Sequence, residues 1–158
     1  MLKVTNVGNT FDDLLVVNAA RVSFGKRHDR FDPVKDTRLI SFLVNPGHWS
    51  PLAHPHATVK MYFTSANTIT KLVQQPDVMA GLTMYQDEDT AVWAITGSLW
   101  ALLKLSYAVP NHALFWNIQT SCPVSTQAFV DKYPQPFKMD DAKTHRIEEF
   151  ITDDDTFT

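Results

Sequence analysis

Residues 54–65, HPHATVKMYFTS, alternate apolar and polar side chains, and this segment constrains the fold more than any other part of the chain. A period of two predicts a strand with two different faces, because successive side chains of a strand point to opposite sides. The chain must therefore combine a sheet with the helices that its other segments predict. The expected faces are Ala57, Val59, Met61 and Phe63 on one side, and His56, Thr58, Lys60 and Tyr62 on the other.

Apolar residues at helical spacing predict helices in most of the remaining chain. Asn9 and Thr10 are candidate N-caps for the first helix, and Pro46 and Gly47 end the second. The expected helices cover residues 11–22, 34–44, 66–74, 89–106 and 111–131, and the last is interrupted near Pro123.

A short strand and two irregular stretches complete the chain. Residues 2–7, LKVTNV, alternate and predict the strand, whereas 24–33 is a polar, basic loop and 75–88 has no clear period. The order of elements is strand, two helices, strand and then helices. It predicts an α+β fold with helices packed on a small, mostly antiparallel sheet. No GxGxxG or GxxxxGKS/T motif follows a strand, which argues against Rossmann and P-loop sites.

Length and composition indicate one ordinary globular domain. The 158 residues carry a net charge of −3, and the single cysteine excludes an internal disulfide. We expect a domain over residues 1–133 and an acidic tail over 134–158. The acidic balance argues against a nucleic-acid partner, and neither a membrane span nor a leader peptide is indicated, so we expect a cytoplasmic protein.

Three stretches of the chain carry motifs of one known protein family. NAARVSFGK at 18–26 contains an Ala-Ala-Arg-Val-Ser motif of the family type. RLISFLVNPGHWSPLAHP at 38–55 is similar to the family's Leu-Ile and Gly-His-x-Ser/Thr-Pro-Phe-Glu-His segment, and GHWSPLAHP looks like that of phage-borne members. VWAITGSLWALLKL at 92–105 and NHALFWNIQ at 111–119 are similar to the family's late helices. Together the three stretches resemble the flavin-dependent thymidylate synthase family, ThyX.

The resemblance implies a fold, an assembly and a set of ligands. Family members are homotetramers in which several subunits contribute to each active site. They bind flavin adenine dinucleotide (FAD), dUMP, NADPH and methylenetetrahydrofolate, and no metal is implied. Ser50 and His112 match flavin-contacting positions of the family. A phage-borne member would act in the host cytoplasm.

The chain departs from the family over residues 69–89, ITKLVQQPDVMAGLTMYQDED. There the family carries an Arg-His-Arg motif and an Asn-Glu-x-Ser-x-Arg segment, which hold the dUMP phosphate and the flavin pyrophosphate. Guanidinium groups match phosphates best, and repulsion between like charges ~4 Å apart is on the order of a few kcal/mol. We therefore expect dUMP binding to be weakened by several powers of ten. The segment's only cation is Lys71, and its acids are Asp77, Asp87, Glu88 and Asp89.

The late helices lack ligand groups as well. By the resemblance, Ser106 stands where the family has an arginine that polarises the uracil ring, and Ala101 where it has a flavin-binding asparagine. Gly97 replaces a second arginine, and Ala53 replaces the glutamate of Pro-Phe-Glu-His. The losses fall at ligand positions while the apolar framework persists, so no catalytic residue is assigned.

Three residues, Arg21, Ser23 and Lys71, are candidates for contact with a substrate. Because an arginine on an apolar helix needs a partner, Arg21 faces either a ligand or a carboxylate. Ser23 either faces the same ligand or ends the helix. A basic loop either touches an anion or is solvated, and its residues are Arg27, His28 and Arg30.

The other reactive side chains favour packing or surface roles. His54 and His56 would share a strand face near His48, as a metal pair could, but no third ligand has a matching spacing. Cys122 is expected to be a buried, inert thiol. The acidic stretch at 140–155 is expected to be solvated, unless it docks a basic partner. Core or interface packing is favoured over flavin stacking for Trp49, Trp93, Trp100 and Trp116.

Three functions are consistent with this sequence. The first is a thymidylate synthase-like protein without dTMP-forming activity, which acts by binding a partner or by assembly through the oligomeric fold. Its partner could be a host protein, a nucleotide or an authentic synthase subunit. The second is an active, divergent flavin enzyme that converts dUMP to dTMP, in which Lys71, Lys60 or the Arg27–Arg30 loop replaces the lost cations across a subunit boundary. The third is a structural or virion-associated phage protein.

Overall fold

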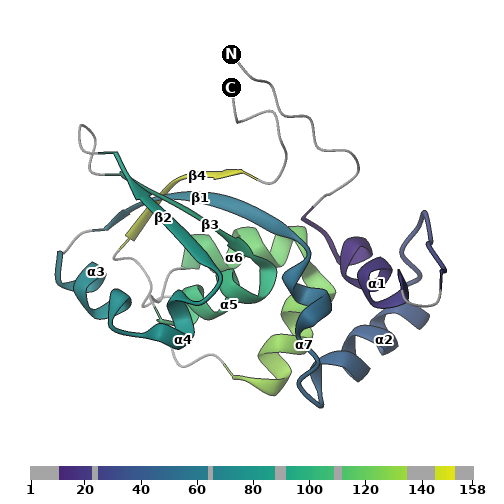
Figure 1. Ribbon diagram of the computed structural model, residues 1–158. Coiled ribbons are helices and arrows are strands. Elements are labelled where there is room, and N and C mark those ends of the chain that lie inside the picture. The colour runs from purple at the N-terminus through teal and green to yellow at the C-terminus, as the bar shows by residue number, and fades with distance from the viewer. Residues whose placement is uncertain are drawn as a thin grey trace.

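The computed structural model describes residues 11–22, 25–63, 66–87, 92–108, 112–134 and 145–151. In this part of the chain, a four-stranded antiparallel sheet lies on a layer of helices (Figure 1). The expected α+β class is thereby confirmed. The strand predicted at residues 2–7 and the caps predicted at Asn9 and Thr10 lie outside the described residues.

The sheet has the strand order β2-β3-β1-β4. β1 pairs antiparallel with β3 and with β4, and β2 pairs antiparallel with β3. Val59 of β1 lies opposite Ile95 of β3, and the hydroxyl oxygens of the opposed Thr58 and Thr96 are 2.6 Å apart. The strand predicted at 54–65 is therefore confirmed. The strands are β1 (His56–Phe63), β2 (Leu82–Gln86), β3 (Val92–Ser98) and β4 (His145–Ile151).

One face of the sheet carries the main core, as the alternation of β1 predicts. Two helices, α5 (Leu99–Ala108) and α6 (His112–Ser121), lie beneath that face (Figure 1). Each large apolar side chain buried there stabilises the fold by about 1.5–3 kcal/mol relative to an exposed one. The buried residues include Ala57, Val59, Met61, Ile95, Leu99, Leu102, Leu103, Leu105, Leu114 and Ile118.

A second group of helices packs beside the sheet: α1 (Asp13–Arg21), α2 (Lys35–Val44) and α7 (Pro123–Lys132) contact one another. Asp13 ties α1 to α7, because its buried carboxylate accepts hydrogen bonds from the backbone N–H groups of Val124 and Ser125, both at 2.9 Å. The Ser125 hydroxyl donates to the same carboxylate at 2.5 Å. A carboxylate at this position satisfies the free N–H groups of the first helical turn.

Several predicted helices are confirmed with small shifts. The helices expected at 34–44 and 66–74 are α2 and α3 (Ala66–Val73), and the one expected at 111–131 is divided into α6 and α7 at Cys122. α1 begins later than expected, because its N-cap is Asp12, which accepts from the Leu15 N–H at 2.8 Å. None of the described helices has the length and apolar character that crossing a membrane requires.

The prediction of one long helix over residues 89–106 is wrong. β3 occupies its first half, and α5 begins only at Leu99. The apolar pattern runs through this boundary because strand and helix turn their apolar sides to the same core. The boundary itself is marked by Ser98, whose hydroxyl oxygen accepts from the Ala101 N–H at 3.2 Å, as an N-cap does.

Two other segments are more regular than their sequence suggested. The stretch at 75–88 contains α4 (Pro76–Met79) and the strand β2. Between them Gly81 adopts a φ of 80°, a left-handed conformation that favours glycine. The segment predicted as an acidic tail, residues 134–158, contributes β4 to the edge of the sheet.

Candidate functional site

Arg21, the first candidate substrate residue, is paired with a carboxylate. It lies in the last turn of α1, and its guanidinium donates to the fully buried carboxylate of Asp36 in α2. The other oxygen of Asp36 accepts from the Asp32 N–H at 2.7 Å. Of the two partners predicted for Arg21, the carboxylate is confirmed. Its Nη1 atom is buried and has no hydrogen-bond partner among the described residues. Ser23 lies outside those residues.

Ser50 begins a short 3-10 helix, η2 (Ser50–Ala53), which packs against α1 and α5. Pro51 and Leu52 anchor this turn in the core, and Ser50 itself is exposed. His112 is the first residue of α6, and its side chain lies outside the described part of the structure. A flavin-binding role for Ser50 and His112 stays a prediction from the resemblance.

Lys71 is exposed on α3, at the opposite end of the molecule from α1 and Arg21 (Figure 1). The side chains of Asp77 and Asp87 are exposed in the same stretch of chain. The Asp77 carbonyl accepts from Nζ of Lys104 at 2.5 Å, which ties α4 to α5. One chain therefore does not bring its candidate substrate residues Arg21 and Lys71 together.

The three late positions that the resemblance assigns to ligand groups lie inside the core. Ala101 is 1% exposed and Ser106 is 0% exposed, and the Ser106 hydroxyl donates to the Leu103 carbonyl at 2.7 Å. Gly97 is buried in β3, where a Cβ atom would meet Cδ2 of Leu82 at 2.6 Å and the Gly81 carbonyl oxygen at 3.3 Å. No room remains for an arginine side chain at position 97 without displacing β2.

Two of the tryptophans offer no free surface to a flavin ring. A bound flavin dinucleotide needs cations or N–H donors for its pyrophosphate and a free aromatic or apolar surface for its ring. Trp49 and Trp100, which could have supplied such a surface, stack on each other with ring centroids 3.7 Å apart. Phe129 packs edge-on against both rings, at 6.0 and 5.4 Å. Core packing is thereby confirmed for Trp49 and Trp100.

Two lysines near this aromatic cluster were not identified as structural residues by the sequence. Lys132 donates from Nζ to the carbonyls of Asn45 and Val44, at 2.5 and 3.3 Å, and so caps the C-terminal end of α2. It also lies over the ring of Trp49 at 5.8 Å, and Lys104 lies over Trp100 at 5.2 Å. The sequence signal that could have identified Lys132 was its place in the last turn of its helix, α7.

The remaining tryptophans differ from each other. Trp93 is partly buried against the core, on β3 rather than on the expected helix. Trp116 on α6 is 58% exposed, so its predicted core or interface packing stays a prediction.

The histidine and cysteine predictions have separate outcomes. His54 follows η2 and precedes β1, so it does not share a strand face with His56. Both are exposed, and Nδ1 of His56 donates to the His54 carbonyl at 2.9 Å. In the described part of the chain, no three His, Cys, Asp or Glu side chains form a group that could hold a metal ion. Cys122 is fully buried as predicted, and burial together with the Asp13 and Asp12 carboxylates raises the pKa of its thiol.

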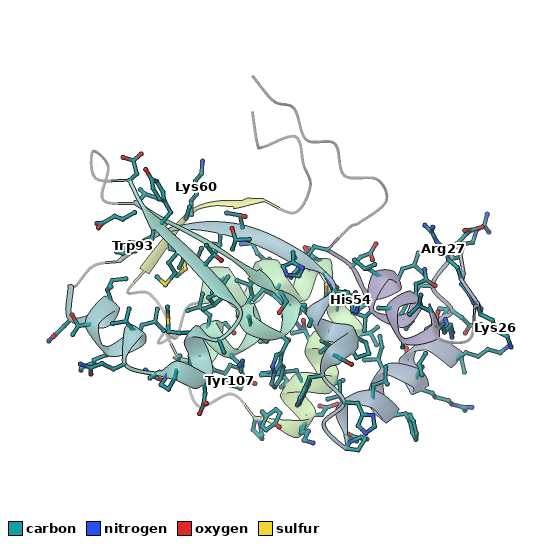
Figure 2. All side chains as sticks on the ribbon, viewed as in Figure 1. Lys26, Arg27, His54, Lys60, Trp93 and Tyr107 are labelled. Carbon is teal, nitrogen blue, oxygen red and sulfur yellow. The ribbon has the colours of Figure 1, made fainter. Side chains whose placement is uncertain are left out.

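The cations proposed as replacements for the lost arginines do not converge. Lys60 points away from the helices on β1, whereas Arg27 projects from the loop beyond α1 at the other end of the molecule (Figure 2). Arg27, His28 and Arg30 are all exposed. Within one chain these groups cannot hold a single phosphate.

Comparison with known proteins supports the resemblance. Residues 7–76 match the model of the family described as thymidylate synthase complementing protein. The match contains two of the three resembling stretches, 18–26 and 38–55, and the late helices lie beyond it. No match was found among curated proteins. The match covers 70 of the 158 residues, and it shows that this part of the chain is similar to the thymidylate synthase complementing protein family.

Proposed function

We propose that this chain is a thymidylate synthase-like protein that does not form dTMP and that acts by binding or assembly through the family's oligomeric fold. One observation carries the proposal. The late positions that would supply ligand groups in the family, Gly97, Ala101 and Ser106, are closed into the core between β3 and α5. A nucleotide could reach them only by displacing packed apolar side chains.

Surface charge supports the same conclusion. In the described part of the segment that replaces the family's arginine motifs, Lys71 faces solvent together with Asp77 and Asp87. A phosphate monoester carries nearly two negative charges, and it binds best to bidentate guanidinium groups. Without them, rigid placement of substrate against a flavin is not achieved. FAD binding is therefore weak or lost.

Assembly is supported by large apolar side chains on the surface. Tyr85 on β2 and Trp116 on α6 are 71% and 58% exposed. Exposed aromatic residues are enriched at protein interfaces, where their burial contributes much of the binding energy. A homotetramer, which is the oligomer expected from the family, would bury such residues. A complex with another protein is the alternative way to bury them.

The test assays the purified full chain for dTMP formation with FAD, NADPH, methylenetetrahydrofolate and dUMP, beside an active ThyX enzyme as the positive control. We expect no dTMP, no flavin absorbance and no change in melting temperature with dUMP. The thermal measurement is sensitive, because a ligand at 100 times its Kd stabilises a protein by about 2.7 kcal/mol. Product formation would refute the proposal. Mass photometry tests the assembly separately, and a monomer would contradict it.

A further inference from the structure

Five exposed cations gather on the loop before α2 and on α2 itself. We define them as the basic face: Lys26, Arg27, Arg30, Lys35 and Arg38. Figure 2 shows Lys26 and Arg27 projecting from this loop, at the end of the molecule formed by α1 and α2. The chain as a whole has a net charge of −3, so the positive charge of the basic face is opposite in sign to the charge of the whole chain.

The loop that carries the basic face is held in place by hydrogen bonds. The Asn18 side chain of α1 donates to the His28 carbonyl and accepts from the His28 N–H, both at 2.9 Å. One carboxylate oxygen of Asp32 accepts from the N–H groups of Val34 and Lys35, at 2.9 and 2.8 Å, at the start of α2. A loop held by these hydrogen bonds presents its cations with a smaller entropic cost on binding.

The basic face has a local excess of positive charge. Its neighbouring acids are Asp29 and Asp32, and Asp32 is already engaged at the start of α2. Asp36 is paired with Arg21 in the core and does not reach the surface. Five cations against two carboxylates leave three positive charges in excess. No salt bridge to these five cations is found in the described part of the chain.

Apolar side chains lie among these cations. Val34, Arg38 and Phe42 follow one another at intervals of four residues and therefore share one side of α2. Val34 is 59% exposed and Phe42 is 70% exposed. The opposite side of the helix carries the buried residues Asp36, Ile40 and Val44, which face the helix layer. A ligand that fits this surface is acidic and also has an apolar side chain.

We propose that the basic face docks the acidic C-terminal segment, residues 152–158, of a second copy of this chain. That segment reads TDDDTFT, with three carboxylates at Asp153, Asp154 and Asp155 and an aromatic side chain at Phe157. Its three negative charges match the three excess positive charges of the basic face. Phe157 is suited to pack against Phe42. The inference rests on the proposed assembly and names a surface that carries it.

The proposed assembly favours a second copy as the source of the segment. β4 ends at Ile151, which pairs with Thr58 on the sheet, and α2 lies with α1 at one end of the molecule (Figure 1). The seven residues after Ile151 reach at most ~25 Å when they are extended. Two copies that exchange their segments about a two-fold axis satisfy both basic faces at once.

The experiment uses charge reversal in two complementary variants of the full chain. The face variant carries Arg27→Glu, Arg30→Glu and Arg38→Glu, and the tail variant carries Asp153→Lys, Asp154→Lys and Asp155→Lys. Analytical ultracentrifugation measures the dissociation constant of each variant and of an equimolar mixture. The exposed Lys71→Glu, on the opposite end of the molecule, is the control for a change of net charge. Circular dichroism verifies the fold.

Each variant alone should dissociate at least tenfold more readily than the wild type, because like charges then face each other across the contact. The mixture should recover association, since each acidic segment meets a basic face and each basic segment meets an acidic one. Lys71→Glu should behave as the wild type. Raised salt should weaken the wild-type complex, because the charges are exposed.

Two results would overturn the docking model. If the face and tail variants associate as the wild type does, another surface carries the assembly, and the proposed function stands without this contact. If the mixture does not recover association, the segment acts within its own chain or binds elsewhere. The proposed function itself is tested separately: dTMP formation by the wild type would refute it, whatever the docking experiment shows.

Discussion

Replacement of Gly97 by alanine tests how tightly β3 is packed against β2 and α5. The added Cβ atom would lie 2.6 Å from Cδ2 of Leu82, 3.3 Å from the Gly81 carbonyl oxygen and 3.4 Å from Cβ of Ala101. The Leu82 side chain can turn aside, but the backbone carbonyl cannot move without shifting β2. The position therefore resists even one methyl group.

The magnitude follows from two opposing contributions. Overpacking a well-packed core costs about 1–3 kcal/mol. Loss of glycine's freedom in the unfolded chain returns about 0.4–1 kcal/mol. We expect Gly97→Ala to lower the free energy of unfolding by about 1–2 kcal/mol. For a protein of this size the melting temperature should then fall by about 2–8 °C.

A double-mutant cycle with Leu82→Ala identifies the cause. This second change removes the atom that the new Cβ would strike, so the double variant should be more stable than the sum of the single effects by about 1 kcal/mol. Urea unfolding followed by circular dichroism measures all four proteins. Leu39→Ala on α2 is the control partner, and its effect should add to that of Gly97→Ala. Additive effects with Leu82, or an unchanged stability of Gly97→Ala, would refute this account of the packing.

Four other outcomes are expected. Asp13→Ala should lower the free energy of unfolding in urea by about 2–4 kcal/mol, since it leaves buried donors of α7 unpaired, whereas the exposed Asp131→Ala should change it by less than ~0.5 kcal/mol. Burial raises the pKa of Asp13 above its ordinary 3.8. The proton-linked part of the Asp13 contribution is therefore fully present below that value and is lost as pH rises through the raised pKa, so the wild type should lose stability relative to Asp13→Asn over this range. A difference in melting temperature that is constant with pH would contradict this. Arg21→Met should cost about 3–5 kcal/mol by leaving Asp36 unpaired in the core, and a double change to Arg21→Met and Asp36→Leu should recover part of it. The Cys122 thiol should react with a disulfide reagent only as fast as the chain unfolds, and rapid labelling of the folded protein would show it to be accessible.

The hydrophobic pattern of the sequence predicted a helix or strand correctly where one period began and ended with that element. β1 was found because its alternation covers eight residues, and α2 because Leu39, Ile40 and Leu43 repeat before a Pro-Gly stop. β3 was missed because its inward residue Ile95 lies four positions before Leu99 of α5, which mimics one helical turn. The N-cap Ser98 was the local signal that separates them.

Contacts between residues that are far apart in the sequence could not be predicted from the hydrophobic pattern. The sequence required a partner for Arg21 but could not choose among the nearby acids, because only the packing of α2 on α1 buries Asp36. The carboxylate of Asp13 meets the start of α7 more than a hundred residues away, and no spacing rule predicts that. The closure of position 106 into the core likewise depends on how α5 lies under the sheet.

The central claim is that β3 and α5 are closed to a nucleotide, and an amide NMR titration tests it most directly. The isotope-labelled full chain is titrated with dUMP, first alone and then with FAD. The account predicts that the amide signals of residues 97–106 keep their positions up to millimolar ligand. Saturable shifts at those amides, with a common dissociation constant, would show an open site and contradict it.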